Sequence, residues 1–164
     1  MRKISNVKKS ICISGNHASY LFKNLNAPPF FPEMMVEENR YPIWERDRLS
    51  KASLKFIREL PARMDIKRHG FSIPVIHYGA GSDTRYLDSI RNPTVVDCEY
   101  LFSIIASDIF LNSRTHGASL VQAENRICMN AGLLGYPHTA QGTAKAGILE
   151  LNDGKADCRL ISIS

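Results

Sequence analysis

Apolar and polar positions alternate most clearly near the end of the chain. Residues 144–151 and 156–163 have this strand-like pattern, and the Asn-Asp-Gly-Lys sequence at positions 152–155 between them is the strongest hairpin turn signal in the sequence. Two shorter apolar runs, residues 118–122 and 127–130, flank a polar turn in the same way. The pattern predicts antiparallel β structure over the last third of the chain.

Three earlier apolar runs predict strands that each lead to a histidine. Residues 10–14, 71–77 and 108–111 have the length and composition of short buried strands. The three histidines at or just beyond their ends are His17, His77 and His116. Catalytic and binding groups gather beyond the carboxyl ends of strands in α/β sheets. Any one of these histidines alone is better explained as a solvated or hydrogen-bonded loop residue, but the shared placement makes all three candidates for a site.

Helical spacing of apolar residues predicts two helices. The first covers residues 47–60, with Asp47 as its N-cap and Pro61 as its stop, and the second covers residues 97–106. Residues 26–42 contain four prolines among aromatic side chains, which predicts a long loop. Strands and helices therefore mix along the chain, and we expect an α/β (α+β) protein.

Length and composition restrict the class of protein. No repeat or linker divides residues 1–164, so we expect one domain. There are 21 Lys and Arg against 16 Asp and Glu, a net charge of +5 that is spread along the chain, so specific nucleic-acid binding is not expected. No apolar stretch reaches the roughly 20 residues of a membrane helix and no signal peptide is present, so we expect a cytoplasmic protein without membrane association. The four cysteines form no Cys-x-x-Cys pair and are expected to pack as apolar side chains.

Short motifs occur in a recognisable order from about Ile11 to the end of the chain. They are Ser14-Gly15-Asn16-His17, Leu60-Pro61, Val75-Ile76-His77-Tyr78-Gly79, Arg114-Thr115-His116 and Asn130-Ala131-Gly132-Leu133-Leu134-Gly135-Tyr136-Pro137. In this order they resemble the calcineurin-like metallophosphoesterases, above all the compact bacterial and archaeal phosphodiesterase branch. The resemblance implies a β-sandwich flanked by helices, with a two-metal centre that activates water against a phosphate ester.

The resemblance also implies roles for individual residues. Asn16 and His77 match ligands of one metal, and His116 matches a ligand of the other. His17 matches the catalytic histidine that contacts phosphate and helps the leaving group depart. Manganese, iron or zinc would suit such a mixture of ligands, with manganese the first expectation.

Two departures from the family pattern weaken the expected metal centre. Nothing before residues 10–14 matches the family's Asp-x-His and Gly-Asp motifs, so we expect this domain to lack the first strands of the usual fold and the carboxylate that bridges the two ions. Ala18 stands where the family has an acidic residue, so His17 has no adjacent carboxylate to orient its ring. These departures predict weak or lost hydrolysis.

Arg114 is a third departure, because it occupies the place of a metal-binding histidine. A guanidinium cannot ligate a cation, but it can hold a phosphate or carboxylate with two parallel hydrogen bonds. An ion pair with a nearby carboxylate explains an arginine here equally well. The candidate carboxylates are Asp83, Asp97 and Asp108.

The sequence therefore predicts a metallophosphoesterase-family protein with impaired hydrolysis and leaves its activity open. One alternative is a surviving phosphodiesterase or phosphatase with a single metal held by Asn16, His77 and His116. The other is a metal-free module that binds phosphate or scaffolds proteins, as a metal-poor relative does in the retromer coat; an apolar patch at residues 30–35 would motivate it. The expected partners are a phosphate ester or other anion, and a second copy or partner chain that covers the open sheet edge.

Overall fold

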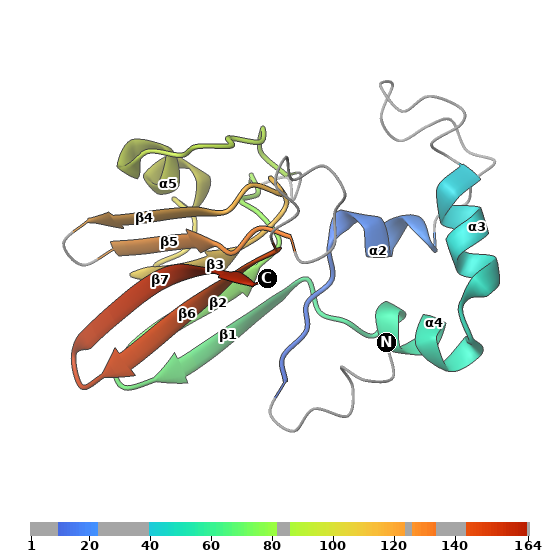
Figure 1. Ribbon diagram of the computed structural model, residues 1–164, viewed down its shortest axis with the longest axis horizontal. Helices are drawn as coiled ribbons and strands as arrows, with labels where there is room; N and C mark the ends of the chain where they lie inside the picture. The colour runs from blue at the N-terminus through green and yellow to red at the C-terminus, as the bar shows by residue number, and fades with distance from the viewer. Residues whose placement is uncertain (1–9, 23–39, 82–85, 124–125, 134–143, 164) are drawn as a thin grey trace. The chain divides into compact units, whose positions relative to one another are not determined.

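The computed structural model describes residues 10–22, 40–81, 86–123, 126–133 and 144–163 (Figure 1). The chain divides into two compact units, residues 1–62 and residues 63–164. The expectation of one domain stays a prediction. No helix in the described ranges is long and apolar enough to cross a membrane.

The N-terminal unit contains short helices. They are α2 (Asn16–Tyr20), α3 (Arg40–Arg48) and α4 (Lys51–Arg58). The Arg58 guanidinium lies over the Phe22 ring, 4.7 Å from its centroid, and the Ser14 backbone N–H donates to the Pro61 carbonyl at 2.8 Å. These contacts connect the segment around α2 to the end of α4.

Two predictions for this unit are wrong. The helix expected over residues 47–60 is divided in two, because the Ser50 hydroxyl accepts the Ser53 backbone N–H at 3.1 Å and starts a new helix there. Asp47 therefore lies inside α3 rather than at an N-cap. Residues 10–14 join no strand among the described residues, and Ile11 is 46% exposed, so its apolar side chain is not part of a sheet core. Residues 26–39, including the apolar patch at 30–35, lie outside the described ranges.

The C-terminal unit is built on a five-stranded mixed sheet in the order β1-β2-β3-β5-β4. Its strands are β1 (Arg63–Arg68), β2 (Phe71–Ile76), β3 (Ile109–Asn112), β4 (Ser119–Ala123) and β5 (Arg126–Asn130). Strands β2, β3 and β5 run parallel, while β1 and β4 pair antiparallel with β2 and β5. A second, two-stranded antiparallel sheet consists of β6 (Ala144–Asn152) and β7 (Lys155–Ile163). Both hairpins predicted for the last third of the chain are confirmed.

Helix α5 (Val95–Leu101) and the β6–β7 hairpin lie on opposite faces of the larger sheet (Figure 1). Alternate residues of β3 show why: Phe110 packs with Cys98 and Leu101 of α5, whereas Ile109 packs with Cys158 of β7. The sheet thus buries both faces, and the predicted layered α+β architecture is confirmed.

Helix α5 begins earlier than the predicted residues 97–106. The Asp97 backbone N–H donates to the Thr94 hydroxyl at 3.3 Å, and the Thr94 backbone N–H donates to the Asp97 carboxylate at 2.7 Å. This capping box makes Thr94 the N-cap and places Asp97 in the first turn. The same hydrogen bonds from Thr94 lower the pKa of the Asp97 carboxyl.

Candidate anion site at the carboxyl ends of the parallel strands

The loops after the parallel strands of the C-terminal unit meet at one edge of its sheet. His77 follows β2, and residues 113–117 follow β3. The Ser113 backbone N–H donates to the His77 carbonyl at 2.9 Å, which joins the two loops. The predicted placement of His77 and His116 beyond strand ends is therefore confirmed.

Asn130, the last residue of β5, fixes the conformation of the loop after β3. Its side chain is only 2% exposed, and its amide nitrogen donates to the Ser113 carbonyl at 3.2 Å and to the Thr115 hydroxyl at 2.8 Å. Its amide oxygen accepts the Gly132 backbone N–H at 2.9 Å. A buried amide satisfied on both sides holds its neighbours firmly, because releasing any of them leaves a buried polar group unpaired.

The loop that Asn130 holds contains two residues in the left-handed backbone region. Arg114 has a φ of 83° and His116 a φ of 60°. Residues other than glycine adopt this region at a cost of roughly 1–2 kcal/mol each. The hydrogen bonds from Asn130 offset this strain, and they determine where the Arg114 side chain leaves the backbone.

The Arg114 guanidinium is oriented by two side chains from the segment before α5. Its Nε donates to the Ser89 hydroxyl at 3.2 Å, and its Cζ lies 4.7 Å from the centroid of the Tyr86 ring. Its Nη1 atom is buried and has no hydrogen-bond acceptor among the described residues. Neither Asp97 nor Asp108 pairs with it, and Asp83 lies outside the described ranges. The arginine therefore carries a positioned positive charge with one uncommitted nitrogen.

His77 and Tyr78 share this charged environment. The half-buried His77 ring lies edge-on to Tyr86, with 5.5 Å between the ring centroids, so His77 and Arg114 contact the same aromatic ring. The Tyr78 hydroxyl accepts the Ile90 backbone N–H at 2.7 Å. Burial raises the pKa of Tyr78, while the Ile90 hydrogen bond and the charge of Arg114 oppose that shift.

The residues of this edge do not fit the expected two-metal centre. Arg114 brings a permanent positive charge against the ring that His77 contacts, and a divalent cation bound by His77 would be repelled by it. Within the described ranges, no three His, Cys, Asp or Glu side chains gather closely enough to hold a metal. His116 is exposed. Its role as a ligand and that of His77 stay predictions.

Asn16 and His17 belong to the N-terminal unit. Asn16 is the first residue of α2, and its amide nitrogen donates to the Tyr20 hydroxyl at 3.1 Å. His17 is exposed, with its ring 5.5 Å from that of Tyr20. The metal role of Asn16 and the catalytic role of His17 also stay predictions.

Three site residues were not singled out for chemistry from the sequence. Tyr86 and Ser89 hold the arginine and have ordinary sequence surroundings. Asn130 holds the loop and begins the last motif of the family resemblance, but it was given no role in the site. Asn130 did carry a signal, since an Asn followed two residues later by Gly is typical of a turn that needs a positive φ, and Gly132 has a φ of 81°. That signal indicates a turn rather than a site.

Comparison with known proteins identifies the fold. No family model matches the sequence, and no curated protein matches it. Solved structures do match, and they show that the chain has the calcineurin-like metallophosphoesterase fold. One is a metallophosphoesterase from Sphaerobacter thermophilus, with a TM-score of 0.69 and 17% identity, over 99% of this chain and 69% of that chain. Another is the hypothetical protein PH1004 from Pyrococcus horikoshii OT3, with a TM-score of 0.75 and 11% identity, over 99% of this chain and 66% of that chain. The chain thus spans about two thirds of these structures.

Proposed function

We propose that this protein is a metallophosphoesterase-family member that binds a phosphate ester through Arg114 and hydrolyses it weakly or not at all. The observation that supports this proposal is the buried, uncommitted Nη1 of Arg114 at the carboxyl edge of the parallel strands. A guanidinium whose direction is already fixed by Tyr86 and Ser89 loses little freedom when it grips an anion.

The chemistry of this edge favours binding over turnover. Hydrolysis of a phosphate ester requires an activated water and a group that accepts its proton. Arg114 stabilises negative charge but stays protonated at any physiological pH, so it cannot take that proton. His77 and His116 carry imidazoles that can donate a hydrogen bond to a phosphate oxygen, which adds to affinity.

Titration of the full chain with inorganic phosphate and with bis(para-nitrophenyl) phosphate, followed by calorimetry, tests the proposal. We expect Arg114→Met to weaken phosphate binding roughly tenfold to a hundredfold, the range of a charge-assisted hydrogen-bonded pair. Arg159→Met is the matched control, because Arg159 is exposed and pairs with Glu150 at 2.8 Å on the β6–β7 hairpin. Equal phosphate affinity in Arg114→Met and the unchanged protein would contradict the proposal.

A hydrolysis assay separates the impaired protein from a surviving enzyme. With manganese, then zinc, added to the full chain, we expect no release of para-nitrophenol above that of His77→Ala. Release that requires metal and disappears in His77→Ala would instead support a single-metal phosphodiesterase.

The expected partner chain and location also stay proposals. The edges of the larger sheet are β1 and β4, and a second copy or another chain would cover one of them. Strand β1 has charged residues along its length, and charged side chains protect edge strands from pairing with another chain. Strand β4 is therefore the better candidate. Light scattering of the purified chain would show a dimer if a second copy covers it. A cytoplasmic location is proposed from the sequence alone.

A further inference from the structure

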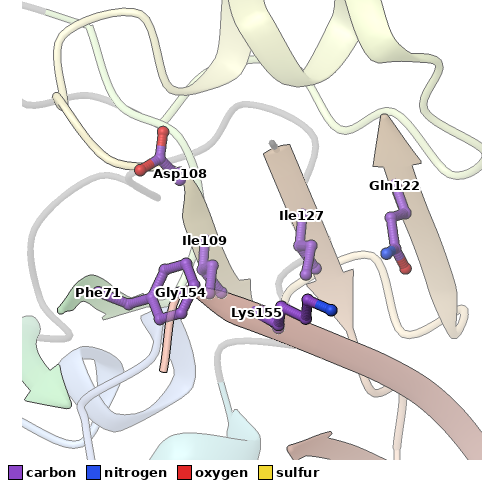
Figure 2. Close-up of a pocket in the computed structure, with 8 residues that line it drawn as sticks. Phe71, Asp108, Ile109, Gln122, Ile127, Gly154 and Lys155 are labelled. Atoms are coloured by element: carbon purple, nitrogen blue, oxygen red, sulfur yellow. The ribbon is translucent and has the colours of Figure 1, made fainter. Parts of the chain in front are cut away.

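A cavity of about 530 Å³ lies at the amino ends of the parallel strands of the larger sheet (Figure 2). Its walls include Phe71 and Ile109, the first residues of β2 and β3, and Gly154 in the turn between β6 and β7. The anion site follows the last residues of the same parallel strands, so the two hollows lie at opposite strand ends. The volume is within the range of about 300–1,000 Å³ that small-molecule sites occupy.

The floor of this cavity is apolar. Ile109 and Ile127 pair directly across β3 and β5, and both belong to the buried cluster between the larger sheet and the β6–β7 hairpin. Phe71 and Ala156 pack against the same cluster. Ile109 and Ile127 are almost fully buried, so the apolar surface that a ring or short aliphatic body would cover comes mainly from the partly exposed Phe71 and Ala156.

The side chains at the rim of the cavity are polar. They are Asp108, Gln122 and Lys155, and none of them makes a side-chain hydrogen bond or ion pair with another described residue. Gln122 pairs with Ile127 across β4 and β5, and it shares a strand face with Leu120, which packs on the apolar cluster. All three rim side chains are exposed, so water satisfies their hydrogen bonds and a ligand has to replace that water.

The rim charges are separated across the opening. In Figure 2 the Lys155 side chain extends toward the side of Gln122, whereas the Asp108 carboxylate lies on the far side of Ile109. Lysine and glutamine offer N–H donors to an anion, and the Asp108 carboxylate offers acceptors to an amine or hydroxyl. Two opposite charges on different sides of the opening favour an elongated ligand with an anionic group at one end and a donor at the other over a compact dianion such as phosphate.

We propose that this cavity binds a small monocarboxylate with an apolar, preferably aromatic, body and a hydroxyl or amino donor at its far end. The carboxylate contacts Lys155 and Gln122, the body lies against Phe71 and Ala156, and the donor reaches Asp108. This site is separate from the phosphate site in position and in the charge it selects.

Titration of the isotope-labelled full chain with para-hydroxyphenylacetate, followed by NMR, tests the site. We expect saturable shifts at cavity residues, and at least a tenfold loss of affinity in Lys155→Met, which keeps the apolar stem. Lys145→Met is the control, because Lys145 lies on the same hairpin and its ammonium donates to the Ser162 hydroxyl at 2.6 Å. No saturable shift at these residues, or equal affinity in Lys155→Met, would overturn the proposal.

A second comparison tests the donor end. Asp108→Asn should weaken para-hydroxyphenylacetate more than phenylacetate, because only the former has a hydroxyl to donate. Equal weakening of both ligands would overturn the role of Asp108. Arg114→Met should leave both affinities unchanged, and inorganic phosphate should not compete; competition by phosphate would overturn the separation of the two sites.

Discussion

The two ends of the larger sheet differ in how their polar side chains are used. At the carboxyl ends of the parallel strands, Asn130 and Ser89 hold the loop and the arginine, and a single guanidinium nitrogen is left over. At the amino ends, the side chains of Asp108, Gln122 and Lys155 make no hydrogen bond or ion pair with the part of the chain that the structure describes. The carboxyl end is therefore preorganised to bind one anion at the fixed Arg114 guanidinium. The amino end can adapt to a ligand, but it must order its long side chains when it binds.

The largest expected effect comes from Asn130→Ala. Removing this buried amide leaves the Ser113 carbonyl and the Gly132 N–H unpaired, which should lower the free energy of unfolding by about 3 kcal/mol or more. Phosphate affinity should fall with it, because Arg114 loses its fixed direction. Urea unfolding and calorimetry measure the two effects.

The matched control for this prediction is Asn152→Ala, in the exposed part of the β6–β7 hairpin. It should change stability by no more than about 0.5 kcal/mol. If Asn130→Ala is as mild as the control, the carboxyl end is not held by the buried amide, and the contrast between the two ends disappears.

Rising alkaline pH should lower the free energy of unfolding of the C-terminal unit in two steps, one at buried cysteines and one at Tyr78. Burial raises the pKa of the Cys158 thiol above 9.0 and that of Tyr78 above 10.0. A group whose pKa is higher in the folded state contributes stability that is complete below the unfolded pKa and is lost as the pH rises through the folded one. Stability should therefore fall first above about pH 9, through Cys158 and through Cys128, whose pKa is also raised, by its hydrogen bond with Cys98 and by burial. It should fall further above about pH 10, through Tyr78.

Urea unfolding at a series of alkaline pH values, with tyrosinate absorbance recorded in parallel, measures this order. Cys158→Ala should reduce the first part of the fall, leaving the contribution of Cys128, and should not change the second part. A profile that is flat from about pH 8 to about pH 11 would show that none of these groups is buried from water in solution.

The smallest expected effect is that of Gln122→Leu at the cavity. Because the Gln122 amide has no partner in the described structure, its loss should leave the free energy of unfolding within about 0.5 kcal/mol of its original value or raise it slightly. Thermal unfolding measures this difference. A clear loss of stability would mean that Gln122 is already committed within the protein, and the contrast with Asn130 would no longer hold.

The sequence predicted those elements whose turns have distinctive chemistry. The Asn-Asp-Gly-Lys turn at 152–155 and the run at 71–77 lead to β6–β7 and β2 as expected. Strand β1 was missed because its sequence is mostly charged, with only Met64 and Ile66 as apolar positions on an edge strand. The run at 10–14 has strand-like composition but no partner strand in the described structure, and composition cannot supply one.

The sequence predicted where the site residues lie along the fold, but it did not predict which residues they contact. The order of motifs placed His77, Arg114 and His116 at strand ends. What the arginine contacts could not be derived, because Ser89 lies 25 positions earlier in the chain and reaches it only through the fold. The choice between an anion contact and an ion pair thus depended on tertiary packing.

The parallel pairing of β2 with β3 joins strands that are separated in the chain by residues 77–108. Val75 pairs with Leu111, and beyond the strand ends the Ser113 backbone N–H donates to the His77 carbonyl at 2.9 Å. The β1–β2 hairpin can form from local contacts, but this parallel join must close a long loop first, so we expect it to form late and to open first in hydrogen exchange. His77 follows one strand of this pair and Arg114 the other. A phosphate that binds both residues would therefore link β2 to β3. Its binding should slow amide hydrogen exchange in both strands, although it contacts neither of them.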